Sequence, residues 1–492
     1  MASEDTRDQI NAELKAALKE ALKRIAALEA ENKKLRAKLN MNSSNSSRPP
    51  SSDPPWTSIN KNQAKRDRKK RRRGGQKGHK GRNRELLPQD RVDHIDVCKP
   101  ARCKECGKKL RRDDPEPQRH QVWDLRDFAS FVTEYKLHAL DCTCGARTRA
   151  SLPEGVPQGQ IGPKLIALIA LLTGKYRLSK RAIPELLYDL LGVTFSVGTI
   201  ANVEQLVSDA LAAQVEEAEE EAEQYVREQS VVYADETGWR EKNKRAWLWV
   251  AVTAMVVVFK VDRSRASDVA RKMLGKSYRG VLVSDQWGGY SWVNQRRRQL
   301  CWAHLLRKFK GWEDRGGVAA ELGQGLGDLA RKMFAYWYQT RDGTMSRWKL
   351  RRVMKKEVIE PFEELLLMGG FCGESSLENS CCNLYLMSQA LWTFVRVEGV
   401  EPTNNTAEQS LRHAVIWRKT SFGTQSEKGS RFAERILTVV MTLRRQKRPV
   451  LQHLVESCEA HLRGAPSPFL LPQAAHALPR TSVRWPERLR KN

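Results

Sequence analysis

The first apolar pattern along the chain has a seven-residue period and covers residues 8–40. Its apolar positions are Leu14, Leu18, Ala21, Ile25, Leu28, Leu35 and Leu39. Asn32 occupies an a position of these heptads, as in parallel two-stranded zippers. The pattern predicts that residues 1–40 form a coiled-coil helix through which the chain self-associates. The alternative is a solvated amphipathic helix that packs on its own domain.

The apolar pattern then stops, and a linker and a basic arm follow. Residues 41–60 are rich in Ser, Asn and Pro and cannot build a core, so we expect a disordered linker. Residues 61–87 form the arm, with thirteen Lys or Arg against one acid between positions 61 and 84. We expect the arm to bind DNA phosphates without sequence selectivity; the alternative is a tail that only aids solubility. The cations that we assign to DNA here are Arg68, Lys69, Lys70, Arg71, Arg72, Arg73, Lys77 and Lys80.

Two close cysteine pairs flank a segment rich in strand formers within residues 88–155. The first pair has the spacing of a zinc knuckle, with Gly107 allowing the tight turn, whereas the second pair is one residue short. Two such hairpins predict a zinc ribbon with one structural Zn²⁺. Cys98 or His138 could replace a ligand, so the fourth ligand stays open, and the alternative is unligated reduced thiols. The four candidate ligands are Cys103, Cys106, Cys142 and Cys144.

Between residues 156 and 228 the apolar period becomes helical. Ser179 caps a predicted helix that ends before Gly192, and Ser196 caps a second helix that runs to about residue 211. Helix, glycine turn and capped helix form the order of a helix-turn-helix, so we expect the second helix to contact DNA. The alternative is a small helical hairpin without a DNA-binding role.

From residue 229 the alternation is that of β-strands, in a predicted meander of the kind that opens a ribonuclease-H-like fold. Two of the apolar strands end in a carboxylate, at Asp235 and Asp285. Carboxylates at the ends of adjacent buried strands repel each other, and a divalent cation relieves this repulsion. The sequence therefore predicts a magnesium site, at which two ions clamp the oxygens of a phosphoryl transfer. The predicted strands are 230–235, 246–252, 254–261, 280–285 and 299–302, with helices at 267–274 and 304–310.

A third carboxylate normally completes such a site, and Glu408 is the candidate. Two structural alternatives compete with this role. With Asn405 as the N-cap, Glu408 would form a capping box, and it could also pair with Arg412 one turn later.

Composition narrows the class of partner. The 492 residues suggest about three domains. Lys and Arg number 86 against 58 Asp and Glu, and a net charge of +28 predicts a nucleic-acid partner. The longest apolar stretch, 247–259, is too short to span a bilayer, so we expect a cytoplasmic protein without a membrane partner, associated with the nucleoid when bound to DNA.

Several stretches, in order, resemble the transposases of the insertion-sequence-66 family. They are Asn45–Asp53, Gly74–Gly81, Ala234–Trp239, Val283–Asp285, Cys301–His304, Asn404–Glu408 and Trp417–Ser426. The resemblance implies a bacterial DDE-type transposase, with the first acid at Asp235, the second at Asp285 and the third at Glu408. It further implies that residues 229–312 and 396–460 form the catalytic domain, interrupted by an all-helical insertion at 313–395 that contacts transposon ends or orders the complex. The alternative is a lid that only covers apolar surface. Residues 461–492 form a basic tail.

The sequence thus predicts a multidomain α+β protein that binds terminal inverted repeats and target DNA, hydrolyses a phosphodiester and transfers the strand. The expected cofactors are Mg²⁺ and structural Zn²⁺, and accessory proteins of the same element are possible partners. The rival functions are a zinc-containing DNA-binding regulator and a non-catalytic end-binding or assembly protein.

Other residues near the predicted site receive roles as well. Glu236 would face away from Asp235 on a strand, so we expect it to be non-catalytic. Cys301 and His304 lack two further ligands nearby in the sequence, which favours a structural role. The cations expected to neutralise DNA phosphates near the scissile bond are Arg412, Arg418 and Lys419.

Overall fold

The computed structural model describes residues 4–39, 41–46, 86–102, 104–109, 115, 117–122, 130–141, 143–144, 147–276 and 278–471. The chain divides into two compact units, one of residues 1–54 with 132–492 and one of residues 55–131. Several predicted features lie outside the described residues: the cations of the basic arm, Cys103, Cys142 and the chain beyond residue 471. Within the part of the chain that is described, no helix has both the length and the apolar character needed to cross a bilayer.

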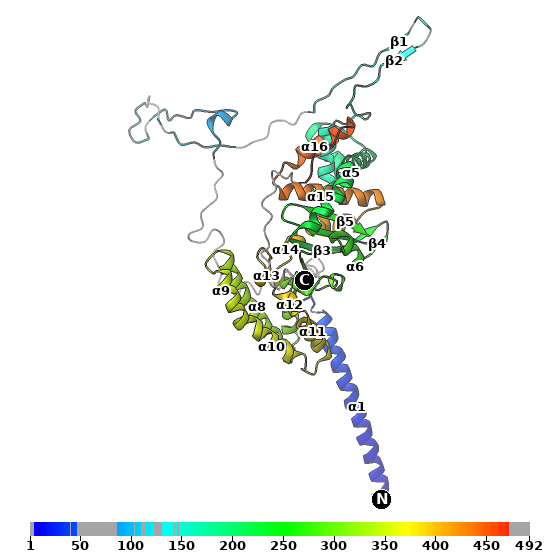
Figure 1. Ribbon diagram of the computed structural model, residues 1–492, viewed down its shortest axis with the longest axis vertical. Helices are drawn as coiled ribbons and strands as arrows, with labels where there is room; N and C mark the ends of the chain where they lie inside the picture. Colours follow the sequence, from blue (N-terminus) through cyan, green and yellow to red (C-terminus); the bar gives the residue numbers. More distant parts are fainter. Residues whose placement is uncertain are drawn as a thin grey trace. The chain divides into compact units, whose positions relative to one another are not determined.

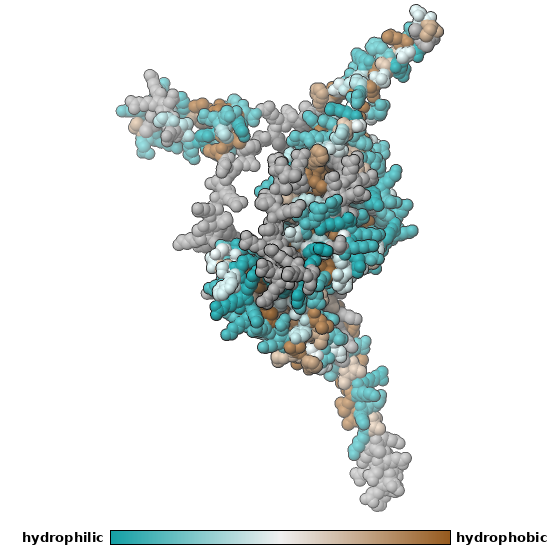
Figure 2. All heavy atoms as spheres, viewed as in Figure 1, coloured by the Kyte–Doolittle hydropathy of each residue, from teal (hydrophilic) through white to brown (hydrophobic). Residues whose placement is uncertain are grey.

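The heptad segment forms one helix, α1 (Glu4–Leu39), as predicted. The leucines of its described side chains are exposed; Leu18, Leu28 and Leu35 keep at least half of their accessible surface. Brown apolar side chains are visible among hydrophilic ones along this helix (Figure 2). The partner helix of a zipper would bury this exposed apolar stripe. Self-association through α1 stays a prediction.

The described cysteines of the predicted zinc ribbon lie in turns. In the smaller unit, an antiparallel bridge joins Arg102 to Lys109 around Cys106, and Gly107 adopts a φ of +70°. In the larger unit, strands β1 (Ala139–Asp141) and β2 (Arg147–Arg149) pair antiparallel, and Cys144 lies in the turn between them. The positive φ of Gly107 agrees with its predicted place in a tight turn, and the zinc ribbon stays a prediction.

Three helices precede the main sheet: α3 (Pro163–Gly174), α4 (Ala182–Leu191) and α5 (Val197–Glu228). Ser196 caps α5 as predicted, because its Oγ accepts from the Thr199 N–H. The predicted cap at Ser179 was wrong in position: the N-cap of α4 is Arg181, and Ser179 Oγ accepts from the Ala182 N–H from two residues further back. The second helix was expected to end near residue 211, and this was wrong: α5 continues through the acidic stretch to Glu228. The buried face of α5 packs on α3, α15 and α16, which holds one long helix in place.

The main sheet has five strands in the order β5-β4-β3-β6-β7. Strands β3, β4 and β5 form an antiparallel meander, while β6 and β7 add parallel to β3. The predicted end of the first strand at Asp235 was wrong, because β3 continues beyond it, pairing Asp235 with Val250 of β4. The strands are β3 (Val231–Glu241), β4 (Lys244–Val252), β5 (Val257–Asp262), β6 (Val281–Ser284) and β7 (Arg298–Leu300).

Helices cover both faces of this sheet. Helix α6 (Ser267–Leu274) shares a core with Val232 and Ala234 of β3. Helices α14 (Asn405–Ser421) and α15 (Glu427–Arg445) share another core with Leu248 and Val250 of β4, and α15 lies against β5 (Figure 1). Helix α16 (Val450–Leu462) packs on α3 and α5. Alternate residues of β3 therefore point to different cores.

The chain between β7 and α14 is helical throughout its described elements, as the apolar pattern predicts. These helices (yellow-green in Figure 1) pack around a core that includes Trp302, Phe362 and Trp392 and that is shared with Val283 of β6 and Leu300 of β7. They are α7 (Trp302–Glu313), α8 (Gly317–Arg341), α9 (Arg347–Met354), the π-helix η5 (Lys355–Ile359), α10 (Glu360–Gly369), α11 (Ser375–Leu386), α12 (Ser388–Leu391) and α13 (Thr393–Arg396).

Candidate active site

The two candidate aspartates occupy matching positions on neighbouring parallel strands. The β3–β6 ladder pairs Val231 with Val281 and Tyr233 with Val283. Asp235 and Asp285 each follow two residues after that last pair, so both side chains point to the same face of the sheet. This is the face covered by α14, because the neighbouring Thr237 accepts a hydrogen bond from Arg418 of α14.

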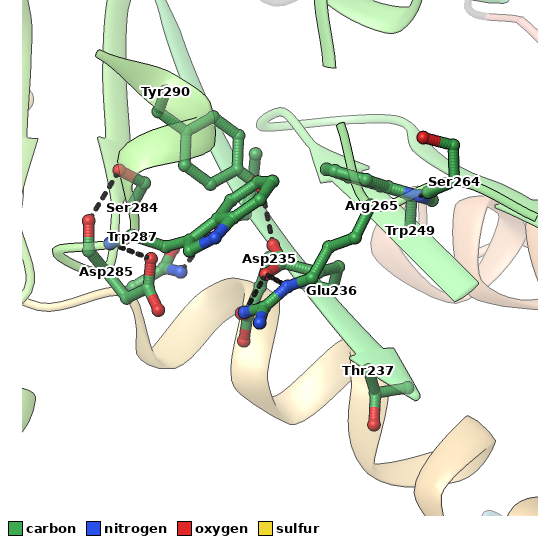
Figure 3. Close-up of polar contacts among 12 residues, drawn as sticks. Asp235, Glu236, Thr237, Trp249, Ser264, Arg265, Ser284, Asp285, Trp287 and Tyr290 are labelled. Atoms are coloured by element: carbon green, nitrogen blue, oxygen red, sulfur yellow. Dashed lines mark hydrogen bonds and ion pairs between the residues drawn. The ribbon is translucent and has the colours of Figure 1, made fainter. Parts of the chain in front are cut away.

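Glu236 points to the opposite face, as its place in the strand predicts. Arg265 donates to Glu236 Oε1 from Nε at 3.0 Å and from Nη2 at 2.7 Å, and the Tyr290 hydroxyl donates to Oε2 at 2.9 Å (Figure 3). The guanidinium of Arg265 lies 4.6 Å from each of the rings of Trp247 and Trp287. Glu236 is thus paired with Arg265, whose guanidinium packs against the rings of Trp247 and Trp287.

Arg298 fixes the end of β6, and the sequence analysis missed it. It is 2% exposed, and its Nη2 donates to the carbonyls of Asp285 and Trp287 at 2.8 and 3.0 Å. Its Nε donates to Ser284 Oγ. These bonds hold the backbone that carries Asp285. The signal was present as an arginine within a predicted apolar strand, since charged side chains are seldom fully buried without partners.

Glu408 enters the site from the first turn of α14. The residue before this helix, Asn404, is fully buried and donates from its side-chain amide to the Ala234 carbonyl, one residue before Asp235. The two structural alternatives for Glu408 were wrong for the residues that the structure describes. Asn404 is the N-cap and its side chain makes no cap hydrogen bond, and Glu408 forms its ion pair with His304 instead of Arg412.

Cys301 and His304 lie beside Glu408, which corrects the expectation that no further ligand is near them. Cys301 Sγ is 3.8 Å and His304 Nδ1 is 3.4 Å from Glu408 Oε1. Sequence spacing could not show this, because about a hundred residues of helices separate His304 from Glu408.

The charges around Asp235 are predominantly negative. Burial raises the pKa of Asp235 well above its usual range, and the charges of Glu236, Asp285 and Glu408 raise it further. The charges of both other candidate acids therefore act on the Asp235 carboxyl group. Hard oxygen donors with uncompensated charge fit Mg²⁺, and the buried Oδ1 of Asn404 beside Ala234 has no hydrogen-bond partner.

The predicted DNA-contacting cations of α14 differ in their surroundings. Arg412 and Lys419 are exposed. The Arg418 side chain instead bonds inside the protein, to Thr237 Oγ1 at 3.0 Å and to the Gly238 carbonyl at 3.1 Å. Arg418 therefore ties α14 to β3.

A second group of cations, which the sequence analysis missed, lies between the α3–α4 turn and α14. Lys175 Nζ lies 2.7 Å from His413 Nε2. Burial, together with neighbouring cations including Arg177 and Arg444, lowers the pKa of Lys175 to about 7 and that of His413 to about 4. The signal was the run of cations at residues 175–181 between two predicted helices.

Arg177 is the most strained member of this cation cluster. It has a φ of +66°, in the left-handed region that costs about 1 kcal/mol or more for a residue with a side chain. Its guanidinium stacks 3.7 Å from the centre of the Trp417 ring, and its Nε and Nη2 are buried without hydrogen-bond partners. Glu204, whose charge acts on Arg177, forms its ion pair with Lys180.

Fold and site together define an α+β protein with three carboxyl groups gathered where two parallel strands meet a covering helix. The profile of the Transposase IS66 family matches residues 158–432, more than half of the 492 residues, and the chain belongs to this family. A profile described as a family of unknown function matches residues 3–85.

Among curated proteins, the chain is 26% identical to the uncharacterized protein y4qI of Sinorhizobium fredii. The match covers 44% of this chain and 45% of that protein, so the chain spans less than half the length of this relative.

Proposed function

We propose that the protein is a DDE-type DNA transposase that cleaves at transposon ends and transfers the strand to target DNA. The observation that carries this proposal is the matched placement of Asp235 and Asp285 on adjacent parallel strands. The charge of Glu408 also raises the pKa of Asp235. Membership of the Transposase IS66 family agrees with it.

The catalytic fold that we propose is ribonuclease-H-like. Its support is the strand order β5-β4-β3-β6-β7, with an antiparallel meander extended by two parallel strands. In this interpretation residues 229–312 and 396–460 form one catalytic domain, and the helices of 313–395 are inserted between them.

Asp235, Asp285 and Glu408 would hold a pair of Mg²⁺ ions. Bound in this way, the ions supply Lewis-acid activation of water and stabilise negative charge on the phosphate. The protein fixes the acids beforehand: Arg298 holds the backbone at Asp285, and Asn404 joins the start of α14 to β3. Arg265 neutralises Glu236, so that this carboxylate does not compete for the cations.

We propose that DNA lies along the cations Lys175, Arg177 and Arg444, beside the neutral imidazole of His413, and along exposed Arg412 and Lys419. Among the described residues, Glu204 acts on Arg177 but forms its ion pair with Lys180, so the cluster keeps an excess of positive charge that favours a polyanion as the ligand. Helix α5 has no Lys or Arg before Arg227, so we assign the phosphate contacts of this helical region to the cations of the α3–α4 turn. The arm of residues 61–87, the zinc ribbon and a coiled-coil dimer complete the proposed assembly, with terminal inverted repeats, target DNA and accessory proteins as its partners.

The test is cleavage of a plasmid that carries the element's ends. Asp235→Asn and Asp285→Asn should lose Mg²⁺-dependent cleavage to below detection while still shifting end DNA in a gel, because each removes a charge that the cations need. Asp189→Asn changes an exposed aspartate of α4 and serves as the matched control, with full cleavage expected. Cleavage by either site variant at the wild-type rate contradicts the assignment, and a wild-type protein that binds a promoter but never nicks DNA favours a regulator.

A further inference from the structure

Cys301, His304 and Glu408 place three different donor atoms around one point. Each offers one ligand atom, and the three atoms lie within 4.8 Å of one another. Cys301 precedes the first turn of α7, His304 lies in that turn, and Glu408 lies in the first turn of α14. Two helix starts, distant in sequence, therefore converge on this group.

The spacing of these atoms is close to that of a tetrahedral metal site. A metal with about 2.3 Å to sulfur and about 2.0–2.1 Å to nitrogen and oxygen separates its ligand atoms by about 3.3–3.6 Å. The distances from Glu408 Oε1 are 3.4 Å to His304 Nδ1 and 3.8 Å to Cys301 Sγ. Small side-chain rotations close the remaining difference of a few tenths of an ångström.

The surroundings of the donors also suit an ion. His304 Nδ1 is buried and has no hydrogen-bond partner among the described residues, so the neutral ring with its proton on Nε2 would present a lone pair at Nδ1. Cys301 is 1% exposed and accepts a 3.1 Å hydrogen bond from the Asn404 N–H, which orients its sulfur beside Glu408. His304 and Glu408 keep 24% and 31% of their side-chain surface exposed, which leaves a way in from solvent.

The donor types select the ion. Mg²⁺ requires oxygen ligands, whereas thiolate with imidazole and one carboxylate is a set that Zn²⁺ prefers. Three protein ligands leave the fourth tetrahedral position to water.

We propose that Cys301, His304 and Glu408 form a Zn²⁺ site that shares Glu408 with the proposed magnesium site and so inhibits DNA cleavage. The inhibition rests on the proposed transposase function, whereas metal binding at the three residues does not. Glu408 cannot serve both sites in full, so occupancy by Zn²⁺ withdraws it from Asp235 and Asp285.

Cobalt binding tests the site directly, because Co²⁺ bound to a thiolate absorbs in the near ultraviolet. The full-length protein should bind one more equivalent of Co²⁺ than Cys301→Ser or His304→Ala. The predicted ribbon cysteines are unchanged in both variants and cancel in the difference. Cys382→Ser removes an exposed cysteine outside the cluster and should keep the extra equivalent. Equal Co²⁺ binding by wild type and both folded variants, checked by circular dichroism, overturns the proposal and leaves Cys301 and His304 to position Glu408.

Cleavage at fixed Mg²⁺ with added Zn²⁺ tests the inhibition. Each variant is normalised to its own rate without Zn²⁺, and half-inhibition of Cys301→Ser should need at least ten-fold more Zn²⁺ than that of wild type. Half-inhibition of wild type and Cys301→Ser at the same Zn²⁺ concentration overturns the inhibitory role. Whether the three residues bind a metal is then decided by the cobalt experiment alone. If the wild-type protein does not cleave under any condition, the proposed function fails, and the cobalt result again stands by itself.

Discussion

Replacing Arg265 with Met removes the cation beside Glu236 while keeping a long apolar side chain between two tryptophan rings. Arg265 and Glu236 are joined by two contacts, at 2.7 and 3.0 Å, on the sheet face opposite the candidate acids. The substitution therefore isolates one question, namely whether Glu236 is held in a structural ion pair.

The size of the effect follows from burial. Loss of one partner from a fully buried ion pair costs about 3–5 kcal/mol. Glu236 is only 1% exposed, but Arg265 is 39% exposed, so solvent screens the pair and the lower end applies. Methionine restores part of the contact with Trp247 and Trp287, because sulfur also packs well on rings. We expect Arg265→Met to lower the free energy of unfolding by about 2–3 kcal/mol at pH 8.

The loss should depend on pH. Burial raises the pKa of Glu236, as does the charge of Asp285, while the hydrogen bonds from Arg265 and Tyr290 lower it. Without Arg265 the pKa of the folded protein rises further. A carboxyl group with a raised folded-state pKa favours folding below its unfolded pKa, and this contribution is lost as pH rises through the folded pKa. The variant should therefore be closer to wild type at pH 5 than at pH 8.

Urea unfolding followed by tryptophan fluorescence measures these differences. Arg279→Met changes an exposed arginine and should remain within about 0.5 kcal/mol of wild type. The double variant with Glu236→Gln should recover most of the loss, because no uncompensated charge remains buried. A loss no larger than that of Arg279→Met, or single losses that simply add, would refute the view that Arg265 neutralises Glu236.

Two further predictions concern DNA and assembly. The double variant Lys175→Met with Arg177→Gln should weaken DNA binding and reduce the slope of log affinity against log salt by the equivalent of about one or two phosphate contacts. The control is Lys272→Gln on α6, which should change that slope by less than the equivalent of about one contact. Because the pKa of Lys175 is about 7, wild-type affinity should fall between pH 6 and 8.5 as this lysine loses its proton, and a flat profile in the wild type would count against its contact with phosphate. Deleting residues 1–40 should lower the number of protomers per assembly, measured by sedimentation equilibrium, if α1 forms the zipper. An unchanged number of protomers would exclude the zipper.

The local pattern of the sequence was sufficient for most elements of the described chain. The predicted helix at 267–274 matches α6, and the predicted cap at Ser196 is present. Such features depend on the period of apolar residues and on side chains that bond to their own backbone a few residues away. Where a neighbour intervenes, the local pattern falls short: β3 passes Asp235 because β4 continues to pair with it.

The sequence by itself determined the family resemblance, the candidate acids and the opposite orientation of Glu236, since alternation along a strand fixes which side chains share a face. Only the tertiary structure decided which distant residues meet. It joined Lys175 to His413 across 238 residues, turned Arg418 inward to β3, and put Cys301 and His304 against Glu408. The physical reason is that such contacts arise when whole helices pack on a sheet through their apolar faces. The apolar pattern of a helix shows which face is buried, but it does not show which distant polar residues this packing brings into contact.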